Sequence, residues 1–151
     1  MRREFHLWLR AAEDDLVDAR DALVRGRYFR VAFYAHQAVE KVLKALFFVV
    51  RREDPPKIHT VTELYALLKE SSFRLDRDLE DQLYILNKYY TVTMCPDAAN
   101  GLPSESVDRL EAERALKLAE EVLSYVRRYT EGCIWRYREA YLSYIKKIQI
   151  R

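Results

Sequence analysis

The stretch of chain between Gly26 and Pro55 most constrains the fold. From Tyr28 to Val50 it is apolar on most of the circumference of a helix. A helix of this kind needs neighbours on all sides, so the pattern predicts the central helix of the fold. Gly26 is suited to end a preceding helix. Pro55 and Pro56 must end the central one, because proline lacks an amide donor and disfavours helical geometry in the residue before it.

Amphipathic patterns on both sides of this segment predict further helices. The first helix has apolar residues at three- and four-residue steps, namely Phe5, Trp8, Leu9, Ala12, Leu16, Ala19 and Leu23. Thr60 and Glu63 have the spacing of a capping box before a third helix. Asp76 can cap a fourth helix, and a fifth is expected to begin near Ser104 or Ser106. The segment 91–103 is the longest predicted loop.

The C-terminal residues form a last amphipathic segment. Gly132 is expected to separate the fifth helix from this segment, which has five basic residues and the single acid Glu139. Its apolar stripe comprises Ile134, Tyr137, Tyr141, Ile145 and Ile148. The predicted fold class is therefore all-α, with a bundle over residues 1–131 and an extra C-terminal helix over 132–151. We expect that extension to pack on the bundle or on a dimer partner.

Composition excludes several classes of protein. A formal charge of +2 over 151 residues is too small for a nonspecific polycation, so any contact with nucleic acid needs a local patch. Cys95 and Cys133 lack C-x-x-C spacing, which fits a reducing cytoplasmic compartment. No apolar run approaches the ~20 residues that a membrane span needs. The three histidines lack metal-ligand spacing and no phosphate-binding glycine loop is present, so neither a metal nor a cofactor is expected.

A line of polar residues interrupts the apolar central helix. Its members at four-residue steps are His36, Glu40 and Lys44, and a neighbouring line consists of Gln37 and Lys41. Burying unpaired charges costs several kcal/mol, so these groups must pair with each other, face a dimer interface or line a groove that accepts a ligand. If His59 from the next loop joins them, the cations suit a nucleotide or RNA phosphate. A solvated or mutually paired face is the structural alternative.

Two phrases of the sequence resemble the HEPN family, named for higher eukaryotes and prokaryotes nucleotide-binding. They are WLRAAEDDL at residues 8–16 and, more specifically, YAHQAVEKVLKAL at residues 34–46. The resemblance continues through Pro56, His59, the Pro96-Asp97 pair and a final helix over 111–126, and covers roughly residues 4–128. It implies an up-and-down bundle of four to five helices that forms a homodimer. It also implies a possible partner, a minimal nucleotidyltransferase, in a toxin-antitoxin pair.

Another branch of the family consists of metal-independent ribonucleases with an arginine and a histidine four to six residues apart. Arg30 and His36 match that spacing, with Arg30 as phosphate clamp and His36 as general acid or base. Six residues of a regular helix, however, rotate by about 240°, so the two side chains meet only across a dimer or if Arg30 precedes the helix. The sequence leaves three hypotheses open: a phosphate-binding module, this ribonuclease, and a structural dimer without a ligand.

Overall fold

The computed structural model describes the backbone of residues 2–149 and the side chains of residues 2–133 and 139. Within this range the chain is helical and has no strand, which confirms the all-α prediction. The helices in chain order are α1 (Arg3–Val24), α2 (Tyr28–Leu46), the π-helical turn η1 (Phe47–Arg51), α3 (Val61–Glu70), α4 (Arg77–Asn87), α5 (Tyr89–Val92), α6 (Pro96–Ala99), the 3-10 turn η2 (Pro103–Glu105) and α7 (Arg109–Gln149). None of the described helices is both long and apolar enough to cross a membrane.

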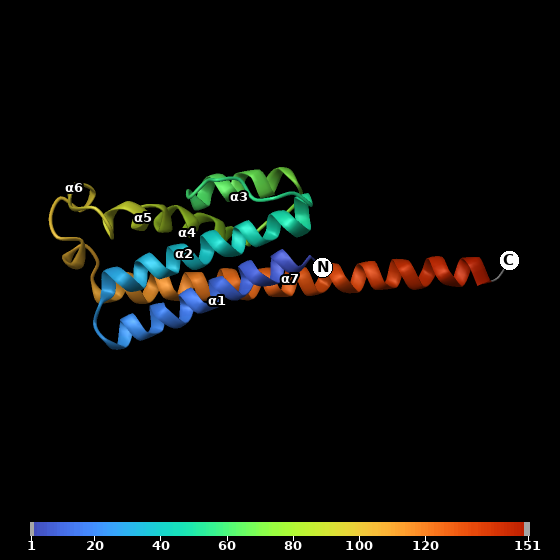
Figure 1. The fold of residues 1–151 in the computed structure, drawn as a ribbon, viewed down its shortest axis with the longest axis horizontal. Coiled ribbons are helices and arrows are strands. Elements are labelled where there is room, and N and C mark those ends of the chain that lie inside the picture. Colours follow the sequence, from blue (N-terminus) through green and yellow to red (C-terminus); the bar gives the residue numbers. More distant parts are fainter. Residues whose placement is uncertain (1, 150–151) are drawn as a thin grey trace.

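Helix α2 lies at the centre of the bundle. It contacts α1, α7, α3, α4 and α5, and Figure 1 shows it between a layer formed by α1 and α7 and a layer formed by α3, α4 and α5. Most of its apolar residues are buried, including Val31, Val39, Leu43 and Leu46. The predicted central helix is therefore confirmed, because the all-round apolar pattern matches the all-round packing.

Both ends of α2 are fixed by the residues that the sequence pointed to. Gly26 has a φ of +68°, and its amide and that of Arg27 donate to the carbonyls of Leu23 and Ala22. These bonds form the glycine-dependent Schellman motif that ends α1. At the other end α2 loosens into η1, and Arg52, with a φ of +58°, turns the chain before the two prolines.

Helices α3 and α4 cover α2 on the side away from α1. α3 starts after Thr60 and α4 after Asp76, as predicted, but neither side chain makes a capping hydrogen bond. The predicted loop over residues 91–103 is partly wrong: it contains the end of α5, the single-turn α6 and the start of η2. Proline at the first position of α6 and of η2 favours such turns, because its fixed φ suits a helix start.

Helix α7 is longer than the sequence pattern indicated. It begins after Asp108, whose carboxylate accepts a 2.8 Å hydrogen bond from the amide of Glu111, and not near Ser104 or Ser106. It also continues through Gly132 to Gln149 and runs on beyond the bundle (Figure 1). The break predicted at Gly132 is therefore wrong, since a glycine weakens a helix without having to end it. The side chains of the stripe from Ile134 to Ile148 lie outside those described, so their packing stays a prediction.

Candidate functional site

The polar line of α2 is buried inside the single chain. His36 is 0 %, Glu40 4 % and Lys44 6 % exposed. The sequence-based expectation that this edge stays accessible at a cleft between two copies is therefore wrong for these three residues. The reason is tertiary: the loop before α3 and the α4–α5 segment pack over this side of α2.

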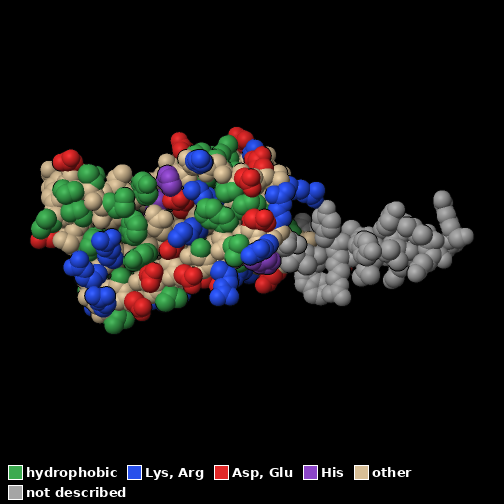
Figure 2. Space-filling model, in the orientation of Figure 1, with side chains coloured by type: hydrophobic (Ala, Val, Ile, Leu, Met, Phe, Trp, Pro, Cys, Tyr) green, Lys and Arg blue, Asp and Glu red, His purple; other side chains and the backbone are tan. Residues whose placement is uncertain are grey.

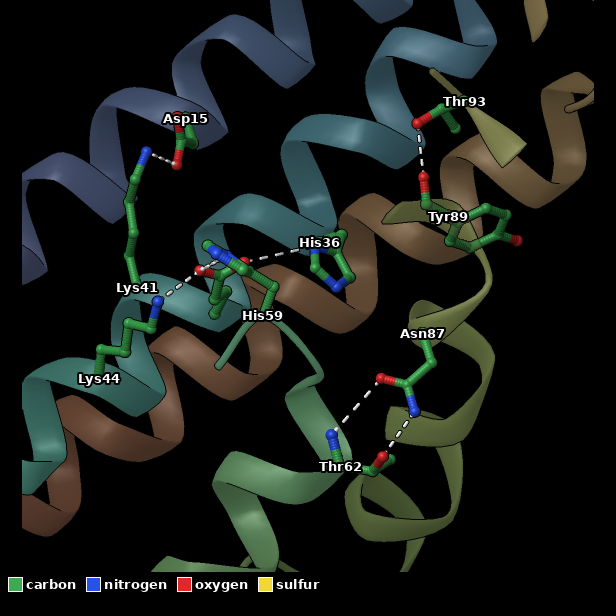
Figure 3. A network of polar contacts seen from close by, with 10 residues as sticks. Asp15, His36, Lys41, Lys44, His59, Thr62, Asn87, Tyr89 and Thr93 are labelled. Carbon is green, nitrogen blue, oxygen red and sulfur yellow. Dashed lines mark hydrogen bonds and ion pairs between the residues drawn. The ribbon is translucent and has the colours of Figure 1, made fainter. Parts of the chain in front are cut away.

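The carboxylate of Glu40 organises this cluster (Figure 3). Its Oε1 atom accepts a hydrogen bond from Lys44 Nζ at 2.7 Å and lies 2.9 Å from His59 Nδ1. The i, i+4 spacing on α2 brings Lys44 to Glu40, and the loop after η1 brings His59. A buried charge pair is tolerated when both members are hydrogen-bonded, so the pair Glu40–Lys44 explains how two charges sit within an apolar helix.

His36 has no comparable partner. Its Nδ1 lies 4.0 Å from Glu40 Oε2, and neither ring nitrogen of His36, nor Glu40 Oε2, has a hydrogen-bond partner among the described atoms. Burial lowers the pKa of His36 to about 4, outweighing the Glu40 carboxylate, which acts to raise it. His36 is thus neutral at physiological pH, with one N–H donor and one nitrogen acceptor available.

Two aromatic rings, those of His59 and Tyr90, lie between the buried polar side chains of α2 and solvent. The rings of His59 and Tyr90 stack with centroids 5.5 Å apart and an interplanar angle of 6°. Tyr90 also lies against His36, with ring centroids 5.4 Å apart. The His59 side chain is 56 % exposed, so its ring forms the outer surface of the stack. We call His36, Glu40, Lys44, His59 and Tyr90 the α2 cluster.

The neighbouring polar line of α2, Gln37 and Lys41, lies beside the α2 cluster and is closer to solvent. Lys41 Nζ donates a 2.5 Å hydrogen bond to Asp15 of α1, and its side chain is 28 % exposed. Burial raises the pKa of Asp15, although Lys41 opposes that shift. Gln37 is half-buried on the same side of α2. Lys41 is therefore a cation that already has a carboxylate partner.

Arg30 lies elsewhere. It is exposed, its guanidinium stacks 4.9 Å from the ring centroid of Phe29, and it borders a hollow between α1 and the start of α2. Arg30 is inside α2, and His36 faces the α2 cluster, so the two side chains do not converge within one chain. This is the divergence that a six-residue step on a regular helix predicts.

Two residues at or beside the α2 cluster were not identified from the sequence. Asp15 was missed as the partner of Lys41, although an acid at this position interrupts the apolar stripe between Ala12 and Leu16 and so signals a buried polar contact. Tyr90 was not identified from the sequence as a neighbour of His59 or His36. Its stack with His59 joins residues 31 positions apart, and no local pattern indicates such a pairing. Among the described side chains, no group of three potential metal ligands is found.

This arrangement offers a neutral histidine, a carboxylate oxygen and an aromatic stack at one place. Such groups can hydrogen-bond the edge of a base or a hydroxyl and can stack against a ring. The lysines contribute positive charge, but each is neutralised by an adjacent carboxylate.

Comparisons with known proteins agree on the fold and its lineage. A protein of Thermus thermophilus, TT1696, is 34% identical, with a TM-score of 0.77 over 84% of this chain and 98% of that one. ST0689, described as an archaeal HEPN homologue, is 27% identical, with a TM-score of 0.69 over 85% of this chain and 98% of that one. A HEPN domain protein of Thermotoga maritima is 28% identical, with a TM-score of 0.65 over 83% of this chain and 98% of that one.

No curated protein sequence matches this chain. The family model described as HEPN domain, in contrast, matches residues 5–129, which include every residue of the α2 cluster. Sequence, helix order and solved structures therefore lead to the same assignment: this chain belongs to the HEPN domain family.

Proposed function

We propose that this chain binds a nucleotide or RNA at the α2 cluster and acts as the homodimeric partner of a minimal nucleotidyltransferase in a toxin-antitoxin pair. The observation that supports the binding proposal is the set of three buried polar atoms that lack partners among the described residues, both ring nitrogens of His36 and Oε2 of Glu40. Because His36 and Glu40 are buried behind the rings of His59 and Tyr90, a ligand reaches these atoms only when those rings move apart. Leaving buried polar groups unpaired costs free energy, so a site that retains them is suited to a ligand that pairs with them.

The cluster suits the base or ribose of the ligand better than its phosphate. Neutral His36 and the free oxygen of Glu40 are hydrogen-bonding groups without net positive charge. The His59–Tyr90 stack supports an additional ring, since every base has a face that stacks on an aromatic side chain. A phosphate at the rim, near Lys41 and Gln37, has to compete with Asp15 for Lys41. At Lys44 it has to compete with Glu40.

The partner proposal rests on the family. HEPN domains commonly form dimers, and the resemblance favours a nucleotidyltransferase as the second protein. Co-expression with the nucleotidyltransferase from a neighbouring reading frame, followed by size-exclusion chromatography with light scattering, tests this part. A stable complex containing two copies of this chain is expected. Two proteins that elute separately, or a monomeric chain, would contradict it.

Calorimetric titration of the purified chain with AMP and with a ten-nucleotide single-stranded RNA tests the binding proposal. Tyr90→Ala is expected to weaken AMP binding about tenfold or more, because it removes the ring that holds His59 in the stack, and base–aromatic stacking contributes roughly 1–3 kcal/mol per base. Tyr84→Ala is the matched control, as Tyr84 is a tyrosine of α4 that is 69% exposed. No binding by the unmodified chain, or an equal loss in both variants, argues against a site at the α2 cluster.

The ribonuclease hypothesis is tested by the same RNA in the presence of EDTA. It requires Arg30 and His36 at one phosphate, and within the chain these residues point in different directions. We therefore expect no cleavage above that of the His36→Ala variant. Cleavage by the unmodified chain that is lost in His36→Ala and in Arg30→Ala would instead support a site assembled by two copies.

A further inference from the structure

Three arginines gather where α1 turns into α2. Arg25, Arg27 and Arg30 are exposed and border a hollow of about 330 Å³, together with Tyr34. Figure 2 shows Lys and Arg side chains gathering at this end of the molecule. The net charge of the whole chain is only +2, so contact with an anion depends on local groups such as these arginines.

Two of these arginines are held in place by one ring. The guanidinium carbons of Arg27 and Arg30 each lie 4.9 Å from the centroid of the Phe29 ring, which is 5% exposed and fixed in the core. Arg30 also lies 6.0 Å from the ring of Phe33. A guanidinium stacked on an aromatic face keeps its N–H donors directed outward in its own plane. The pair is therefore ordered before any ligand arrives.

No carboxylate in the described part of the chain pairs with these arginines. Among the side chains that the structure describes, no ion pair involves Arg25, Arg27 or Arg30, whereas Arg20 of α1 pairs with Glu120 at 2.8 Å. Asp18 and Asp21 border the same hollow and reduce its positive potential, but neither forms a salt bridge with these arginines. The three arginines and two aspartates leave one positive charge in excess, and no hydrogen bond from the three guanidinium groups to another described residue is seen.

We propose that Arg25, Arg27 and Arg30 form a binding site for the phosphodiester backbone of single-stranded RNA, separate from the α2 cluster. Planar guanidinium groups bind phosphate oxygens in a bidentate manner, and two of them on one ring match successive phosphates better than a single cation. Tyr34 on the wall of the hollow supplies an aromatic ring against which a base can stack. An acidic peptide would supply negative charge for the arginines but no base to stack on Tyr34.

The site is distinct from the one in the proposed function, so the two can fail independently. Its experiment measures the affinity of a labelled ten-nucleotide single-stranded RNA at several NaCl concentrations by fluorescence anisotropy. The test variant replaces Arg25, Arg27 and Arg30 by glutamine. The control variant replaces three exposed arginines of α1 and α4 that lie outside this turn, which are Arg3, Arg10 and Arg77. Both variants lose the same charge.

The test variant is expected to bind the RNA about tenfold more weakly at 0.1 M NaCl. The slope of log affinity against log salt is expected to become shallower by about 2, because each phosphate contact on a single strand contributes about 0.7. The control is expected to keep both values within about twofold. An equal loss in both variants, no RNA binding by the unmodified chain, or equally tight binding of polyglutamate would overturn the proposal. Circular dichroism spectra that coincide for all three chains exclude misfolding as the cause.

Discussion

His36 Nδ1 lies 4.0 Å from Glu40 Oε2, and neither atom has a hydrogen-bond partner among the described residues. The distance is too long for a direct hydrogen bond. Glu40 commits its other oxygen to Lys44 and His59. Glu40 therefore has one oxygen with hydrogen-bond partners and one without, and His36 has none. The predictions on pH and on charge follow from this arrangement.

Stability is expected to fall as the pH is lowered through the range between about 6.5 and 4. Burial lowers the pKa of His36 in the folded chain to about 4, so below pH 6.5 the unfolded chain takes up the proton first. One pKa unit corresponds to about 1.4 kcal/mol, so the loss from this group approaches about 3 kcal/mol at pH 4. Urea unfolding at pH 7, 6, 5 and 4 measures it.

His36→Gln is the control for the pH dependence, since glutamine does not titrate. Carboxylates such as Glu80 also lose stabilising contacts in acid, so the comparison depends on the difference between the two chains. The unfolding free energy of the unmodified chain should fall relative to that of His36→Gln as the pH is lowered. If the unfolding free energies of both chains decrease in parallel, His36 is not the group responsible.

Removing either member of the Glu40–Lys44 pair is expected to destabilise the fold by about 3 kcal/mol, because the remaining charge is buried without a counter-charge. The double variant Glu40→Gln with Lys44→Met should recover a large part of this loss, since no charge remains. A double-mutant cycle from urea unfolding gives the coupling energy. Purely additive losses would mean that the two side chains contribute independently.

Gly132→Ala is expected to stabilise the chain by about 0.5–1 kcal/mol. Gly132 is inside α7, and a methyl group there would meet no atom within 4 Å. Gly26→Ala is the matched control with the opposite expected sign. A methyl group at Gly26 also meets no atom within 4 Å, but the φ of +68° strains an alanine there by about 1 kcal/mol. Thermal unfolding should therefore shift in opposite directions. A decrease for Gly132→Ala would argue against a continuous α7.

Asp108→Ala is expected to cost about 1 kcal/mol, because it removes the side-chain hydrogen bond to the amide of Glu111 at the start of α7. Thr60→Ala at the start of α3 should cost less than about 0.5 kcal/mol, since Thr60 makes no capping hydrogen bond. Urea unfolding of both variants checks the contrast. Equal losses would show that the Asp108 contact has no special role.

Local patterns were reliable where one interaction decided the outcome. Gly26 ended α1 because only a residue that tolerates a positive φ closes the Schellman motif. They were less reliable where neighbours competed. The capping-box spacing of Thr60 and Glu63 located the start of α3 without producing the hydrogen bond, and Gly132 marked a weak point of α7 that did not become a break.

What the sequence determined by itself is the all-helical bundle, the central position of α2 and the presence of a polar line along it. The physical reason is periodicity, which fixes which residues share a face. Only the tertiary structure decided that His36, Glu40 and Lys44 are buried, that Tyr90 stacks on His59, and that Arg30 stacks on Phe29 apart from His36. Those outcomes depend on which segments pack over α2, and such contacts between distant residues leave no periodic trace in the chain.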